Sequence, residues 1–253
     1  ADDFVWEGTT IKGFTEKGTA KSHILTTLTF PNNSANQGVT AIANQAFEQK
    51  LNKINKLKIP ATLQKIGEAA FMNNQLTNID FSEAHNLHID RAAFHNNKLT
   101  KLNLPTGAGL TFNQDCYSNQ DYGIFSDNKT LTEVTLPQDM TAIPGCFLKS
   151  SRVKSITIPA SVTTIGGQAF YGYYLDEDQK LTNLTFAPGS QLTTIGRYAF
   201  SGQRLTTVDL PNTVTTIGDG AFGYNKLTSI TLSESLTGLS YGVFAENKLT
   251  GVL

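Results

Sequence analysis

Apolar and polar positions repeat along most of the chain with a period of 22 to 24 residues. An Ile-x-x-x-Ala-Phe motif recurs, and we assign Tyr117 as an aromatic anchor alongside eight phenylalanines. The nine anchors are Phe47, Phe71, Phe94, Tyr117, Phe147, Phe170, Phe200, Phe222 and Phe244. A unit this short cannot bury its own apolar face, so the repeat predicts stacked coils that share one continuous core.

A second motif, Leu-Thr-x-Leu-x-Leu-Pro, follows the anchors, as at 99–105, 131–137 and 205–211. Its alternation indicates a strand with one buried face, ended by a proline where no ladder donor is needed. A second extended piece ending at glycine follows, as at 161–166 and 213–218. The pattern therefore predicts a solenoid with one parallel strand per coil and short second strands or turns on the other side.

Asparagines recur two residues before the first leucine of the strand motif, at Asn74, Asn97, Asn225 and Asn247. Stacked asparagine side chains at a turn can bond the backbone of the coil. Their recurrence is thus explained structurally and needs no ligand.

The two ends of the chain differ from the repeat. Residues 1–24 do not fit it, and Glu7-Gly8 between apolar residues predicts a hairpin, so we expect an N-terminal cap over 1–24. The array then covers 25–253, with insertions at about 118–130 and 171–180. The sequence starts at Ala1, which is consistent with a removed leader, and it stops at Leu253 inside a strand motif.

The repeat resembles the BspA-like leucine-rich-repeat family, the Treponema-type class. The segments 227–233 and 239–244 carry the resemblance, with equivalents along 25–253. The resemblance implies a leucine-rich-repeat solenoid of the α/β class, rich in strand, with a curved parallel sheet. It also implies a secreted or surface-attached bacterial protein, often an adhesin or a binder of host proteins.

Composition narrows the function. Only 16% of the 253 residues are charged, and 20 basic residues against 21 acidic ones give a net charge of −1. Nucleic-acid binding needs a strong basic excess, so we expect no nucleic-acid partner. No apolar run of about 18 residues exists, so we expect no membrane insertion.

The sequence offers little catalytic chemistry. It has no phosphate loop, no Gly-x-Ser-x-Gly and no paired carboxylates at defined helical spacing, which predicts a protein without catalytic residues or cofactors. His85, His88 and His95 share one coil, and acidic residues gather at 176–178. Neither set has the spacing of a metal site, so we expect no metal.

Both insertions carry aromatic and acidic residues, and we expect them to project from one edge about 10 Å apart. Exposed tyrosines and phenylalanines are common binding anchors, and solenoid insertions often mark a binding face. The alternative is that these aromatic side chains fold back over local apolar surface. The candidate contacts are Tyr122, Phe125, Tyr171, Tyr173, Tyr174, Asp176, Glu177 and Asp178.

The open strand face offers a second candidate surface. Its outward residues are small and polar, without the aromatic or arginine anchors typical of hot spots. Such a face suits a glycan or a charged protein, or it is simply solvated.

Cys116 and Cys146 are assigned to the alanine slot of consecutive coils, about 5 Å apart. That separation suits a disulfide, but parallel side-chain directions would strain it, and buried thiols are the alternative. Both states stay open.

These observations favour an extracellular or cell-surface binding module that recognises a host or matrix protein or a glycan. The alternative is a structural spacer or stalk within a larger surface protein, as the end inside a strand motif suggests. A glycan-acting enzyme is the third hypothesis.

Overall fold

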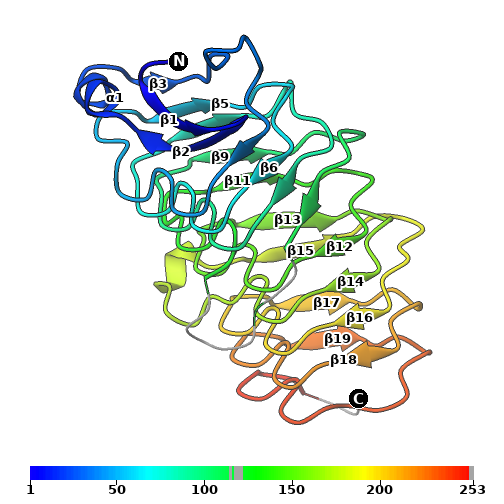
Figure 1. Ribbon diagram of the computed structural model, residues 1–253. Coiled ribbons are helices and arrows are strands. Elements are labelled where there is room, and N and C mark those ends of the chain that lie inside the picture. Colours follow the sequence, from blue (N-terminus) through cyan, green and yellow to red (C-terminus); the bar gives the residue numbers. More distant parts are fainter. Residues whose placement is uncertain (114–115, 117–121, 251–253) are drawn as a thin grey trace.

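The computed structural model describes residues 1–113, 116 and 122–250, and it shows a leucine-rich-repeat solenoid (Figure 1). Two ladders of parallel strands run along it. The long-strand face is formed by β3 (Thr27–Leu28), β5 (Lys56–Lys58), β7 (Asn78–Asp80), β9 (Lys101–Asn103), β11 (Glu133–Thr135), β13 (Ser155–Ile158), β15 (Asn183–Phe186), β17 (Thr207–Asp209) and β19 (Ser229–Thr231). The short-strand face is formed by β4 (Ala41–Ile42), β6 (Lys65–Ile66), β8 (His88–Ile89), β10 (Thr111–Phe112), β12 (Ala142–Ile143), β14 (Thr164–Ile165), β16 (Thr194–Ile195) and β18 (Thr216–Ile217).

Both faces match the two extended pieces expected from the sequence, which confirms the solenoid. The alternating leucine and isoleucine side chains of the two faces point inward and are buried. The tenth expected strand, which begins at Leu249, runs into residues outside the described part of the chain.

The first residues form a hairpin of β1 (Phe4–Glu7) and β2 (Thr10–Phe14), followed by α1 (Glu16–Ser22). The Thr15 side chain caps α1 by accepting a hydrogen bond from the Gly18 N–H. Strand β2 pairs in parallel with β4, so the hairpin starts the short-strand ladder. Phe4 and Phe14 lie against Phe47, covering the first coil's apolar edge.

The anchors form two stacks of phenylalanine rings inside the solenoid. Ring centroids are 5.4 Å apart at each step of the first stack and 5.0 to 6.1 Å apart in the second. The first stack is Phe47, Phe71, Phe94 and Phe125, and the second is Phe170, Phe200, Phe222 and Phe244. Such columns of large apolar rings replace the core that one coil cannot make alone.

The fourth anchor is Phe125, so the prediction that Tyr117 is this anchor was wrong. Phe125 stacks on Phe94, and the Phe94 N–H donates to the Ile124 carbonyl. The segment from Phe112 to Tyr117 has the spacing of the anchor motif, which led to the assignment of Tyr117. The insertion, however, comes before the anchor rather than after it. Residues 123–130 therefore belong to the regular coil, and Tyr117 lies outside the described residues.

Between the two ring stacks, the structure corrects a second anchor assignment, that of Phe147. The Leu148 N–H donates to the Ala169 carbonyl, as the Phe170 N–H does to the next coil, so Leu148 is the anchor of its coil. Phe147 takes the alanine slot and lies edge-on to Phe125. Cys146 therefore precedes the alanine slot, in a left-handed conformation with φ 56°.

The asparagine ladder is confirmed. The Asn97 Oδ1 accepts the Leu76 N–H at 3.0 Å, and its Nδ2 donates to the Phe71 and Phe94 carbonyls. Asn128 and Gln203 take the same role in their coils. Each such side chain satisfies buried backbone groups of two neighbouring coils, which would otherwise be costly.

Candidate functional site

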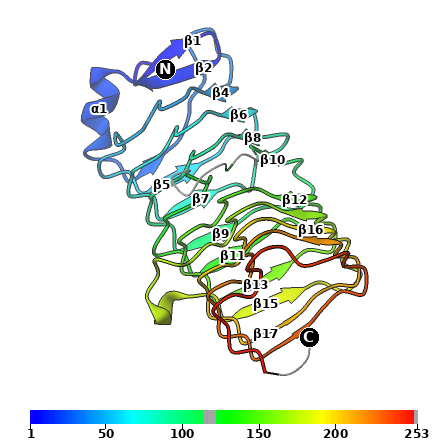
Figure 2. The ribbon, with the colours of Figure 1, turned by 90° about the horizontal axis from the view of Figure 1, so that it is seen from below.

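The second insertion lies along one edge of the solenoid, before the long strand β15. It carries Tyr171, Tyr173 and Tyr174 and the short helix η1 (Glu177–Gln179). Helices α1 and η1 lie on the same side in both views, at the ends where the long strands begin (Figures 1 and 2). The insertion was expected to project from this edge, and its tyrosine rings also make contacts along it.

The Tyr173 side chain passes over the neighbouring coil and contacts the coil after it. Its ring lies 5.3 Å from that of Tyr224 at 87°, although a whole coil separates the two residues. Gly202 in that intervening coil has φ 74°, and a Cβ there would collide with the Tyr173 backbone. Glycine is therefore needed at 202 for both its conformation and its lack of a side chain.

Four tyrosines, Tyr171, Tyr173, Tyr174 and Tyr224, form what we call the tyrosine patch. The Tyr174 side chain is 77% exposed, and Tyr173 and Tyr224 are each 48% exposed. Ring centroids within the patch are 5.3 to 6.3 Å apart. The rings therefore support one another and present a firm aromatic surface to solvent.

Tyr171 is the half-buried base of the patch. Burial, together with its tyrosine neighbours, raises the pKa of Tyr171 to about 12. Next to it, the Arg197 guanidinium lies 4.7 Å from the Tyr198 ring centroid, a cation–π contact. The patch thus combines tyrosines with an adjoining arginine, the residue types enriched in hot spots.

The acidic residues of the insertion are held by local partners. Glu177 pairs with Lys180 at 2.8 Å and with Lys226 at 4.0 Å, and the hydrogen bond from Lys180 lowers the pKa of Glu177. Asp176 accepts a hydrogen bond from the Gln179 side chain. Asp178 is exposed. The three carboxylates therefore do not converge as metal ligands would.

The first insertion is organised differently. Phe125 is fully buried in the ring stack, so the prediction that it is an exposed contact was wrong. Tyr122 is 48% exposed, and its ring lies on His95 with centroids 4.1 Å apart. No ring contact joins Tyr122 to the tyrosine patch within the described residues, so the structure does not bring the two sets of candidates together.

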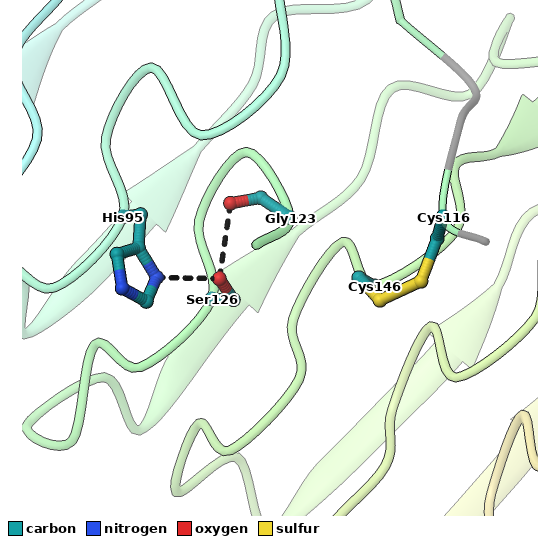
Figure 3. Close-up of a disulfide and its surroundings, with 5 residues drawn as sticks. All are labelled: His95, Cys116, Gly123, Ser126 and Cys146. Atoms are coloured by element: carbon teal, nitrogen blue, oxygen red, sulfur yellow. Dashed lines mark hydrogen bonds between the residues drawn. A yellow bond between two sulfur atoms is a disulfide. The ribbon is translucent and has the colours of Figure 1, made fainter. Parts of the chain in front are cut away.

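His95 is buried beneath Tyr122. Figure 3 shows its ring facing Ser126. Its Nδ1 lies 2.7 Å from the Ser126 Oγ, which donates to the Gly123 carbonyl, so the histidine Nδ1–H is the donor. Burial lowers the pKa of His95 to about 4, and the nearby Lys149 charge acts in the same direction. The Asp127 Oδ2 is 3.7 Å from the same Nδ1, and burial raises the pKa of Asp127.

These residue types do not form a hydrolytic triad. Ser126 is fully buried and cannot reach a substrate, and Ser126 and Asp127 both face the same histidine nitrogen. The other candidate histidines have separate partners: His85 faces the Glu83 carbonyl, and His88 faces Thr111 and Asp90. Across the described residues, no three His, Cys, Asp or Glu side chains gather as a metal site.

Cys116 and Cys146 are joined by a disulfide, with Cα atoms 5.8 Å apart (Figure 3). Of the two states left open by the sequence, the structure has the bonded one. The bond ties the first insertion to the next coil and leaves no free cysteine among the described residues.

Comparison with known proteins decides the family. The chain matches the family described as "BspA type Leucine rich repeat region (6 copies)" over residues 16–122, 40–176 and 146–252. The chain belongs to this family. Proteins of this type are generally binding modules and are typically found at the cell surface.

Solved structures show the same fold for this BspA-type protein. A leucine-rich-repeat protein from Bacteroides ovatus is 22% identical, with a TM-score of 0.62, over 96% of this chain and 66% of that one. The T. pallidum leucine-rich-repeat protein is 17% identical, with a TM-score of 0.56, over 88% and 87% of the two chains. The chain therefore spans just under two thirds of the first relative. No curated protein matches the sequence.

Sequence reasoning missed Tyr224 and Gly202, which complete the patch. Both belong to coils without insertions, and their signal lies only in the alignment of neighbouring coils. Tyr224 directly precedes the ladder residue Asn225, as Gly202 precedes Gln203. No helix in the described part of the chain is long and apolar enough to cross a bilayer.

Proposed function

We propose that this protein is an extracellular recognition module that binds a host or matrix protein through the tyrosine patch. The observation that carries the proposal is the contact of exposed tyrosine rings from separate coils, fixed by Gly202. Rigid tyrosines supply large contact area at low entropic cost, and they dominate many protein interfaces. The disulfide supports a location outside the reducing cytosol.

The test is a solid-phase binding screen of the purified chain against fibrous matrix proteins, plasma proteins and mucin. The triple variant Tyr173→Ser/Tyr174→Ser/Tyr224→Ser is tested in parallel. We expect saturable binding of at least one partner and at least a tenfold loss in the triple variant, since each hot-spot residue contributes on the order of 2 kcal/mol.

Tyr122 provides a matched control because it is also 48% exposed but lies on the other insertion. We expect Tyr122→Ser to leave binding unchanged. Equal binding by the triple variant would place the site elsewhere, and no binding to any tested protein would favour the spacer hypothesis.

A further inference from the structure

The long-strand ladder opens at three places, and two of them resemble each other. The third opening separates β11 from β13, and the two similar ones separate β7 from β9 and β15 from β17. Hydrogen bonds still join these coils before the strands begin, such as Lys98 N–H to the Leu76 carbonyl and Arg204 N–H to the Leu181 carbonyl. The strands therefore separate toward their carboxyl ends.

A groove lies at each of the two similar openings. The first groove, of about 410 Å³, is lined by residues 78–82 and 103–105, and the second, of about 350 Å³, by 186–187, 189–190 and 209–212. Where neighbouring strands are paired, their carboxyl ends are bonded, for example by the Ile59 N–H to the Asp80 carbonyl. The grooves thus follow from the missing pairing.

Both grooves have a phenylalanine at the same register. Phe81 and Phe186 are each the sixth residue of their strand motif, where most other coils carry leucine or isoleucine. Phe81 also lies edge-on to Phe94 in the core, which fixes its place.

The two grooves share their chemistry. Each has an apolar floor, formed by Phe81 and Leu104 in the first and by Phe186 and Leu210 in the second. Each also has one carboxylate, at least one side-chain amide and a hydroxyl on its walls. These polar residues are Asn78, Asp80, Ser82 and Asn103 in the first groove and Ser190, Asp209 and Asn212 in the second.

The protein holds the carboxylates in place. The Asp80 Oδ1 accepts the Ser82 N–H at 2.9 Å, and the Asp209 Oδ1 accepts the Thr231 hydroxyl at 2.7 Å. Their remaining acceptor capacity, with the amides, suits ligands that carry neighbouring hydroxyl groups. An apolar floor suits the C–H face of a sugar ring, and fixed carboxylates disfavour anionic ligands.

We propose that these two grooves bind neutral oligosaccharides. They lie four strand intervals apart, about 19 Å, so a branched or extended chain reaches both. They are at the carboxyl ends of the long strands, whereas the tyrosine patch lies where those strands begin. The proposal therefore goes beyond the tyrosine patch and stands independently of it.

The test is a glycan array that contains neutral, sialylated and sulfated oligosaccharides, followed by calorimetry with the best neutral probe. Variant Asn78→Ala/Asn103→Ala removes two exposed groove side chains, and Ser190→Ala/Asn212→Ala does the same in the second groove. We expect each double variant to weaken binding about tenfold, as two lost hydrogen bonds would.

Asn183→Ala is the matched control. Asn183 is an exposed asparagine at the same strand register as Asn78, but it lines neither groove. We expect wild-type affinity from this control and from the tyrosine triple variant. Binding confined to sulfated or sialylated probes, unchanged affinity in both groove variants, or no binding of any neutral probe would overturn the proposal.

Discussion

The aromatic residues described in the two insertions have opposite outcomes. The first comes before its anchor, so the chain must return to bury Phe125, and Cys116 is tied to the next coil. The second comes after its anchor Phe170, where the core is already complete, and its tyrosines remain at the surface. The position of an insertion relative to the buried anchor thus decides whether its aromatic side chains stabilise the fold or stay available for recognition.

The largest expected difference comes from replacing one aromatic residue of each insertion by alanine. Phe125→Ala should lower the free energy of unfolding by about 3 to 5 kcal/mol, because it removes a fully buried ring and leaves a cavity. Tyr174→Ala should change it by less than about 0.5 kcal/mol, because that ring is mostly exposed. Urea denaturation of both variants measures the difference, and equal losses would contradict the comparison.

Removal of the disulfide should have the next largest effect on stability. It closes a loop between residues 30 positions apart, so removing it should cost about 3 to 4 kcal/mol through chain entropy. Urea denaturation of the variant Cys116→Ala/Cys146→Ala against the wild type measures this loss. Reductant should destabilise the wild type to a similar extent and leave the double variant unchanged. If reductant left the stability of the wild type unchanged, the disulfide would not stabilise the first insertion.

The repeat was predictable because each coil has the same pattern of apolar and polar positions. Leu102 and Ile165, for example, alternate with polar neighbours that identify the buried face, and Asn97 marks its ladder. The anchor assignment was wrong where it rested on spacing alone. Phe112 to Tyr117 has the right count, but the sequence does not show where the chain leaves the coil. Only the stacking of Phe125 on Phe94 decides it.

The candidate site was harder to predict because it joins different coils. Tyr173 and Tyr174 stand out in the insertion, but Tyr224 matters only once the coils are stacked in register. Gly202 shows no signal in its own coil, since its role is to leave space for Tyr173. Similarly, the grooves depend on lost pairing between strands, which strand motifs of normal appearance do not report.

As pH falls from about 6.5 to about 4.5, the first insertion should lose stability before the second, because the lowered pKa of Glu177 confines that carboxylate's loss to lower pH. Burial holds the folded-state pKa of His95 at about 4, below its ordinary 6.5, so the unfolded chain binds the proton more readily between these values. Stability should therefore fall as pH drops from about 6.5 to about 4, by up to about 3 kcal/mol, and His95 should add no further loss below that. Asp127 acts in the opposite direction because its pKa is raised, so its contribution favours the fold in acid.

The variant His95→Phe isolates the histidine's share, because Ser126 keeps its hydrogen bond to Gly123 and a ring remains beneath Tyr122. Denaturation series at pH 7, 6, 5 and 4 should show a flatter profile for this variant than for the wild type. His85→Gln, an exposed histidine change, should keep the wild-type slope. If His95→Phe retained the full acid sensitivity, the buried histidine would not be the cause. If acid instead weakened partner binding by the tyrosine patch while the fold stayed intact, the two insertions would not be separate in function.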